Sequence, residues 1–242
     1  MNSKRQKEYR VGTVIKDSEQ VVKIALEASP FIQNHLAKIQ ENTEKMEGRG
    51  LKVLPYELRN GELKTVYMKA STFADLLCQA VAKGDRSLFL QLCDRLLDQI
   101  EMASDEVEQE DCIIYELGID VYRSDKNYGK ILREGYLDMI PRNCFIKGEE
   151  LWWFDQEWTL DNVPSKFILF RGLLEMYSAF PEIQEFFPLE KVFLNYGMET
   201  YINTFVMLNQ LFMSMVMDKD YAGIFAEQRD QGVCKKNIMK LL

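Results

Sequence analysis

The sequence predicts an α+β protein of two lobes: a small, β-rich N-terminal lobe with one helix and a larger, mainly helical C-terminal lobe. Three observations support this. Short β-branched runs separated by turn residues dominate residues 1–68, helical spacing of apolar residues dominates residues 69–242, and a hairpin pattern within residues 144–158 interrupts the helices. The 242 residues, 47% of them hydrophobic, suffice for one large domain or two closely joined lobes.

The first lobe begins with two β-branched runs. Arg10–Ile15 and Gln20–Leu26 are separated by the turn-like Lys16–Glu19, which predicts a hairpin. A helix opens at Ser29-Pro30, because proline suits the first helical turn and apolar residues then recur at helical intervals. Gly48-Arg-Gly50 ends this helix.

Two further strands complete the first lobe. Leu51–Leu58 and Glu62–Met68 are joined by Arg59-Asn-Gly61, a strong signal for a tight hairpin turn. The predicted order is therefore strand, strand, helix, strand, strand. The boundary between the lobes fits near Tyr67–Ala70.

Helix signals dominate the second lobe. Ser71 or Thr72 can cap a helix over residues 73–82, and Asp85 or Ser87 opens the next one. The second of these helices runs through Ile100.

Three later segments are also informative. Glu101–Asp111 is acidic without a basic residue, which indicates a solvated loop or a helix end. Pro164 starts a helix that runs through Tyr177. Tyr201–Met217 is strongly apolar, but polar residues interrupt it, so we expect a buried helix and no transmembrane segment.

Asp138 and Asn143 stand five residues apart, and Asp155 follows them. Cys144–Phe154 holds two short apolar runs around a Lys147-Gly148 turn, which predicts a hairpin. Because antiparallel strands return the chain to its origin, Asn143 and Asp155 should be neighbours. One carboxylate can deprotonate an attacking hydroxyl, while an amide oxygen and a second carboxylate can hold magnesium. The alternative is a polar turn and an ordinary hairpin with solvated carboxylates.

In motifs and in element order, the chain resembles the kinase-like superfamily of protein kinases and aminoglycoside phosphotransferases. The motifs are Asp138-Met-Ile-Pro-Arg-Asn143 and Phe154-Asp-Gln-Glu157, and the first lobe resembles a kinase small lobe without its first strand. With Asn162-Val-Pro164 and Phe167–Arg171, the chain more narrowly resembles kinase-like domains attached to bacterial methyltransferases and glycosyltransferases of surface-polysaccharide synthesis. The best understood of these phosphorylate a terminal sugar.

The resemblance implies a catalytic loop over residues 136–143 and a metal-binding hairpin over residues 144–158. Asp138 matches the catalytic aspartate, and Asn143 and Asp155 match the magnesium ligands. The implied cofactors are ATP and Mg²⁺.

Lys23 lies where the family places the strand lysine that holds the α- and β-phosphates, although an ordinary exposed strand lysine is the alternative. A helix carboxylate should pair with it. Glu41 is our candidate for this partner. Glu44 lies at a similar position along the helix and is the alternative. For Glu157 two roles stay open: assisting the metal, or capping the next turn.

The chain also departs from the family pattern. Tyr136-Leu137 replaces the histidine-containing pair that normally precedes the catalytic aspartate, so the usual bracing of the loop is missing. No glycine-rich loop precedes Arg10, so the phosphate cradle is missing or replaced by side chains such as Lys4, Arg5 or Arg10. We expect His35, the single histidine, at the helix surface or in a cap.

Composition narrows the function classes. A net charge of −8 argues against nucleic-acid binding, which needs clustered basic residues. A single histidine excludes multi-histidine metal sites. Five scattered cysteines suit reduced thiols, and the charged N-terminus lacks a signal-peptide pattern, so we expect a cytoplasmic protein.

These observations predict an ATP- and magnesium-dependent phosphotransferase that acts on a hydroxyl of a small molecule, sugar or surface-glycan intermediate. The alternative is a pseudokinase-like module that binds nucleotide or serves as a scaffold for a methyltransferase or glycosyltransferase partner. A helical interaction protein is a third hypothesis, but it leaves the hairpin and Lys23 without a purpose.

Overall fold

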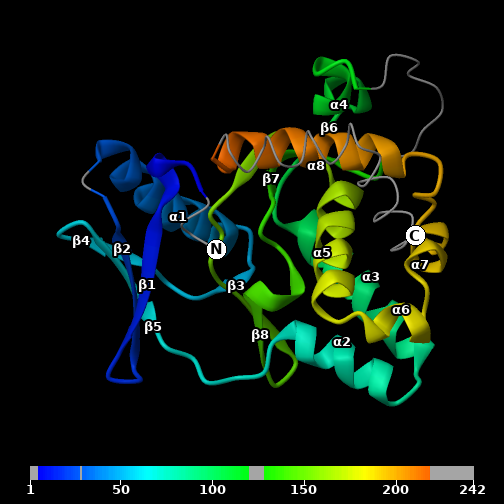
Figure 1. The fold of residues 1–242 in the computed structure, drawn as a ribbon, viewed down its shortest axis with the longest axis horizontal. Helices are drawn as coiled ribbons and strands as arrows, with labels where there is room; N and C mark the ends of the chain where they lie inside the picture. The colour runs from blue at the N-terminus through cyan, green and yellow to red at the C-terminus, as the bar shows by residue number, and fades with distance from the viewer. Residues whose placement is uncertain (1–4, 28, 120–127, 219–242) are drawn as a thin grey trace.

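The computed structural model describes residues 5–27, 29–119 and 128–218. It is an α+β structure with a β-rich N-terminal region and a helical C-terminal region, which confirms the predicted class at this level. In Figure 1 the N-terminal sheet and helix α1 (Pro30–Gly48) occupy one side of the molecule, and most of the helices occupy the other.

An antiparallel sheet of strand order β1-β2-β5-β4 forms the N-terminal region. Its strands are β1 (Val11–Lys16), β2 (Gln20–Ala25), β4 (Glu57–Arg59) and β5 (Glu62–Val66). Both tight turns have positive φ at two successive residues: 52° and 57° at Asp17 and Ser18, and 51° and 78° at Asn60 and Gly61. This is the geometry of type I′ turns, which match the twist of hairpins. Both predicted hairpins are confirmed.

The predicted strand over Leu51–Leu58 is divided into two pieces. β3 (Lys52–Val53) pairs in parallel with β9 (Glu150–Trp153) of the C-terminal region, while β4 pairs with β5. Pro55 lies between the two pieces and has no backbone N–H for a ladder hydrogen bond. The prediction of one continuous strand was therefore wrong, and β3 connects the two regions.

Helix α1 begins and ends as the sequence predicts. The Ser29 side chain caps it by accepting a hydrogen bond from the backbone N–H of Phe31. Its buried face carries Ile32, Leu36 and Ile39. The helix therefore covers one face of the N-terminal sheet while its later turns reach the C-terminal region.

The C-terminal region is built mainly from helices. The longest are α2 (Phe73–Ala82), α3 (Arg86–Met102), α5 (Ser165–Ala179) and α8 (Ile202–Val216); the shorter ones are α4 (Ile113–Glu116), α6 (Glu182–Phe186) and α7 (Leu189–Asn195). Thr72 and Asp75 form a capping box at the start of α2, and Asp85 caps α3. The helix predicted from Pro164 to Tyr177 corresponds to α5.

A second antiparallel sheet, of order β10-β7-β6, was not predicted. It consists of β6 (Glu106–Val107), β7 (Ile131–Tyr136) and β10 (Thr159–Pro164). Gly135 in β7 is one reason why the sequence did not predict this strand, since glycine is depleted in strands. A Cβ at Gly135 would lie only 1.9 Å from Cγ1 of Val163, so the close approach of β7 and β10 requires glycine.

The predicted hairpin at residues 144–153 is confirmed. β8 (Cys144–Lys147) pairs antiparallel with β9, with Cys144 opposite Trp153, and Gly148 takes a positive φ of 64° in the turn. The sheet order β3-β9-β8 places this hairpin between the N-terminal β3 and the helices.

The described residues bury two hydrophobic clusters. The smaller one lies between α1 and the N-terminal sheet and includes Val11, Leu36 and Leu63. The larger one fills the C-terminal region, but Met46 of α1 also belongs to it. The division into lobes at residues 68 and 69 stays a prediction, and residues 219–242 of the second lobe lie outside the described part of the chain.

Helix α8 runs across the C-terminal region toward the N-terminal sheet (Figure 1). One face of it is buried through Phe205, Leu208 and Phe212, whereas Met207 and Met215 are exposed. The prediction of a buried helix is therefore correct for one face only. None of the helices in the described residues is both long and apolar enough to cross a bilayer.

Candidate functional site

Asp138 lies in the loop between β7 and the 3₁₀ turn η4 (Pro141–Asn143). The loop is short and internally bonded: the N–H of Ile140 donates to the carbonyl of Asp138 at 2.8 Å, and Asn143 N–H donates to the Ile140 carbonyl at 2.9 Å. The Asn143 side chain closes it, with Nδ2 donating to the Asp138 carbonyl at 3.2 Å. Asp138 and Asn143 are therefore neighbours, as their spacing predicts.

The β8–β9 hairpin brings Asp155 back to the same place. The N–H of Phe154 donates to the Asn143 carbonyl at 3.0 Å, so the residue that follows lies beside the loop. Asp155 takes a positive φ of 60°, uncommon for a residue with a side chain, and its N–H donates to the Tyr56 hydroxyl at 3.2 Å. A backbone held in this conformation by its surroundings is frequent at functional sites.

Lys23 reaches this cluster from β2. Its side chain is only 5% exposed, and its Nζ forms ion pairs with Oδ1 of Asp155 and with Oε1 of Glu157, the latter at 2.6 Å. The alternative of an ordinary exposed strand lysine is therefore wrong, whereas the phosphate-binding role of Lys23 stays a prediction.

Glu157 is the most highly connected carboxylate of the site. Besides Lys23, it forms an ion pair with Arg5 and lies 3.5 Å from Nε2 of His35. Its own N–H donates to Oδ2 of Asp138 at 3.0 Å, which ties the two carboxylate-bearing segments together. Glu157 therefore neither caps a turn nor faces solvent.

The cations and carboxylates shift one another's pKa values. Burial raises the pKa of Asp138 to about 7, the carboxylates of Glu157 and Asp155 add to this, and Arg171 opposes it. Burial also raises the pKa of Asp155, with Lys23 opposing. For Glu157 the effect of burial is outweighed by Lys23, His35 and Arg5, and its pKa lies well below the usual value.

The aspartate loop is braced by groups that the sequence did not indicate. Gln156 Nε2 donates to the Asp138 carbonyl at 3.0 Å, and Asn42 of α1 donates to the Gln156 carbonyl at 2.9 Å. Arg171 of α5 donates to the Leu137 carbonyl at 3.4 Å. These contacts support the loop where Tyr136-Leu137 replaces the expected histidine pair.

The predicted partner of Lys23 is wrong. Glu41 is exposed on α1 and pairs with Lys38 and Lys45 of the same helix, at 3.3 and 2.9 Å, and Glu44 accepts a hydrogen bond from Gln40. Their spacing from Lys23 placed these carboxylates at a suitable position along α1. It did not determine whether they lie on the face of α1 that is turned toward Lys23. Within the described residues, the ion pairs of Lys23 are with Asp155 and Glu157 instead.

Two other expectations need correction. His35 is not at the helix surface: it is 6% exposed and packs against the rings of Tyr9 and Trp158, with centroids 5.3 and 4.7 Å away. Of the basic residues considered for a phosphate cradle, Arg5 pairs with Glu157, and Arg10 pairs with Glu27 and Asp218. Lys4 lies outside the described residues.

The residues present fit a magnesium ion in part. Carboxylate and amide oxygens are suitable donors, and Mg²⁺ is usually held by one or two carboxylates plus phosphate and water oxygens. Asp155 is suitably accessible, with a side chain 34% exposed. Across the described ranges, no group of three or more histidine, cysteine, aspartate and glutamate side chains is arranged to hold a metal. Asn143 and Asp155 would therefore need ligands from a bound nucleotide.

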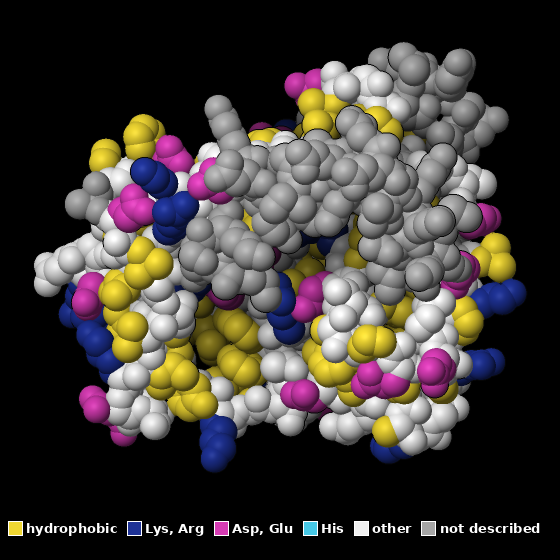
Figure 2. Space-filling model, in the orientation of Figure 1, with side chains coloured by type: hydrophobic (Ala, Val, Ile, Leu, Met, Phe, Trp, Pro, Cys, Tyr) yellow, Lys and Arg dark blue, Asp and Glu magenta, His cyan; other side chains and the backbone are white. Residues whose placement is uncertain are grey.

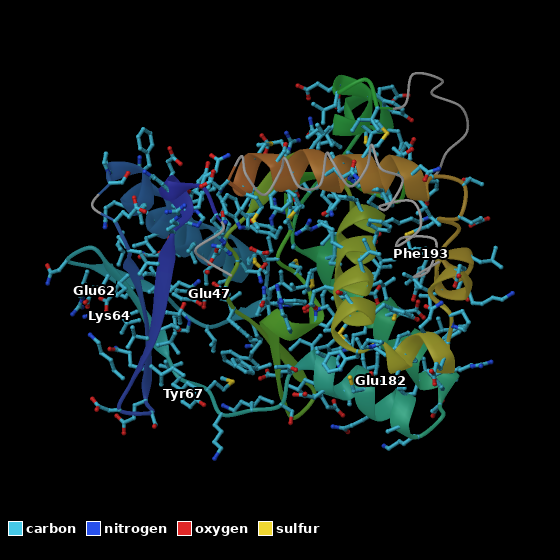
Figure 3. All side chains as sticks on the ribbon, viewed as in Figure 1. Glu47, Glu62, Lys64, Tyr67, Glu182 and Phe193 are labelled. Carbon is cyan, nitrogen blue, oxygen red and sulfur yellow. The ribbon has the colours of Figure 1, made fainter. Side chains whose placement is uncertain are left out.

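An apolar surface lies between the two regions of the structure. In Figure 2, hydrophobic side chains gather in a hollow between the N-terminal sheet and the helices. Tyr67, labelled in Figure 3, is 37% exposed on the connection that leads from β5 toward α2. Such a surface suits a planar, partly apolar group.

No protein-family model matches this chain, and no curated protein does.

Proposed function

We propose that this protein is an ATP- and magnesium-dependent phosphotransferase with a kinase-like fold that acts on a hydroxyl group. The observation that carries the proposal is that three distant segments converge: Lys23 of β2 pairs with Asp155 after the hairpin, and Glu157, two residues further on, donates its N–H to Asp138 of the loop. In this proposal phosphoryl transfer uses Lys23, Asp138 and Asp155.

Each residue has a definite role in this proposal. Asp138 orients the acceptor hydroxyl and takes its proton, and a pKa raised to about 7 suits a base that must gain and lose a proton near neutral pH. Lys23 binds the phosphates. Asn143 and Asp155 hold Mg²⁺, which neutralises phosphate charge when it is bound.

The surroundings are consistent with a nucleotide. The hollow beside Tyr67 can take the base through apolar contact (Figure 2). We propose a hydroxyl of a sugar or glycan intermediate as the acceptor. This rests on the resemblance to domains of surface-polysaccharide synthesis, which is carried by Phe154–Trp158, Asn162–Pro164 and Phe167–Arg171. A methyltransferase or glycosyltransferase partner is proposed on the same ground, and a cytoplasmic location on the scattered cysteines, which suit reduced thiols.

One observation favours the second candidate, a pseudokinase-like module. Lys23 forms an ion pair with Asp155, the same carboxylate that we assign to the metal. A protein in which this pair were permanent would bind nucleotide without magnesium or would not bind it.

The experiment measures phosphate release from ATP with water as the surrogate acceptor, in the presence of Mg²⁺, for the wild type and for Asp155→Ala. Loss of a metal carboxylate should lower the rate at least about a hundredfold, since each tenfold costs about 1.4 kcal/mol of transition-state stabilisation. Asp161→Ala, an exposed carboxylate on β10, is the control and should keep the wild-type rate. Equal rates for Asp155→Ala and the wild type would reject the proposed function.

A further inference from the structure

We propose that Glu157 is a positioning residue that holds the Lys23 ammonium at the phosphate position, and that Arg5 holds Glu157 in turn. This rests on the proposed function, because it gives Lys23 a nucleotide to bind. It replaces the helix carboxylate that the sequence suggested with a carboxylate that follows the β8–β9 hairpin.

Exposure separates the two carboxylates that contact Lys23. The Asp155 side chain is 34% exposed, although its Oδ1 beside Lys23 is buried, whereas the Glu157 side chain is 5% exposed. When Asp155 turns to a metal, Lys23 loses one of its two anionic partners. A buried ammonium without a carboxylate is strongly unfavourable, so Glu157 must keep it.

The two oxygens of Glu157 divide its contacts. Oε1 faces Lys23 at 2.6 Å, while Oε2 faces Arg5 and, at 3.5 Å, Nε2 of His35. A carboxylate fixed at both oxygens cannot rotate away when nucleotide binds. Its N–H, bonded to Oδ2 of Asp138, fixes its backbone as well.

Arg5 is itself held by the end of α8, with which the segment around Arg5 pairs. Arg5 and Met217 form an isolated antiparallel β-bridge, and the N–H of Gln6 donates to the Val216 carbonyl at 3.0 Å. Arg10 continues the attachment by pairing with Asp218 at 3.1 Å. The N-terminal segment thus joins α8 to the lysine anchor, and the guanidinium lies 5.9 Å from the centroid of the Trp158 ring.

The test uses two measurements on the full chain. The first is the labelling rate of Lys23 by an amine-reactive acetylating reagent without nucleotide, followed by peptide mass spectrometry. The second is the dissociation constant for ATP with Mg²⁺, measured by calorimetry. The variants are Glu157→Gln, Glu157→Asp and Arg5→Gln, with Glu47→Gln, an exposed carboxylate of α1 (Figure 3), as the control.

We expect Glu157→Gln to speed Lys23 labelling about tenfold, the factor that corresponds to about 1.4 kcal/mol of lost ion pairing, because a side chain that Glu157 no longer holds reaches the reagent more often. The dissociation constant for ATP with Mg²⁺ should rise by about tenfold or more, because Lys23 is no longer held at the phosphate position. Arg5→Gln should give a smaller change in the same direction. Glu157→Asp should recover part of both effects, which loss of stability alone would not produce.

The proposal is overturned when folded Glu157→Gln matches Glu47→Gln in both measurements. If Glu157→Gln does not fold, Glu157→Asp and Arg5→Gln decide, and wild-type values in both overturn it. Labelling needs no nucleotide. If the wild type shows no magnesium-dependent ATP binding, the proposed function fails, and the labelling rates still report whether Glu157 holds Lys23.

Discussion

Replacing Lys23 with methionine tests the electrostatic account of the site through stability. Lys23 is 5% exposed and pairs with Asp155 and Glu157. Removing one partner of a buried ion pair costs about 3–5 kcal/mol, because the other charge stays buried without compensation. In Lys23→Met, Asp155 can still contact water and Glu157 still pairs with Arg5. We therefore expect a loss of unfolding free energy at the lower end of this range, about 3 kcal/mol.

The assay is urea unfolding of the wild type and Lys23→Met at pH 7, with the free energy of unfolding compared at equal m-values. Lys64→Met is the matched control. Lys64 is a lysine of the same sheet that pairs with Glu62 at 3.0 Å near the surface (Figure 3), and its loss should cost less than about 1 kcal/mol. A cost for Lys23→Met no larger than that of the control would refute the reasoning.

The effect of pH gives a second check on the same variant. The pKa of Glu157 is depressed in the folded protein, so its ion pairs stabilise the fold above the usual carboxyl pKa of about 4.3. That stabilisation is lost as pH falls through the lowered pKa of the folded state. The difference between wild type and Lys23→Met should be full at pH 7 and narrow below about pH 4. A difference that grows on acidification would contradict the assigned charges.

Three further predictions follow from single features. The rate of magnesium-dependent phosphate release should rise as pH increases through about 7, because Asp138 must lose its proton to act as a base; a flat wild-type profile from pH 6 to 8 would contradict this. Glu41→Gln should leave that rate unchanged and alter the unfolding free energy by less than about 1 kcal/mol, since its pairs are at the surface; a large rate loss would restore Glu41 as the lysine partner. Gly135→Ala should destabilise the fold by about 1–3 kcal/mol in urea unfolding, because its Cβ would overlap Val163; a neutral result would place β7 and β10 further apart.

The parts of the site that follow from local sequence were predictable. The five-residue spacing keeps Asn143 close to Asp138. The hairpin then brings Asp155 beside Asn143, because a β-hairpin fixes the distance between its own ends. Lys23 was singled out by the resemblance to the kinase-like superfamily, and its role in phosphate binding stays a prediction. Turn residues such as Asn60-Gly61 and the cap at Ser29 likewise determine structure within a few residues.

The parts of the site that depend on contacts between distant segments could not be predicted from the sequence. Glu157 pairs with Lys23 across 134 residues and with Arg5 across 152, and no local pattern encodes such a contact. The sheet of β7 and β10 was missed because its strands lie far apart in the sequence. In addition, β7 interrupts its apolar run with Arg133, Glu134 and Gly135. His35 carries a polar ring that favours the surface, but the rings of Tyr9 and Trp158 bury it.

The most direct test of the central claim is calorimetric titration of ATP into the wild type and Asp155→Asn, each with and without Mg²⁺. The account predicts binding to the wild type that strengthens at least about tenfold with the metal, a difference of about 1.4 kcal/mol, and loss of this metal dependence in Asp155→Asn. Wild-type binding that is equally tight without Mg²⁺, or that is absent under both conditions, would contradict it.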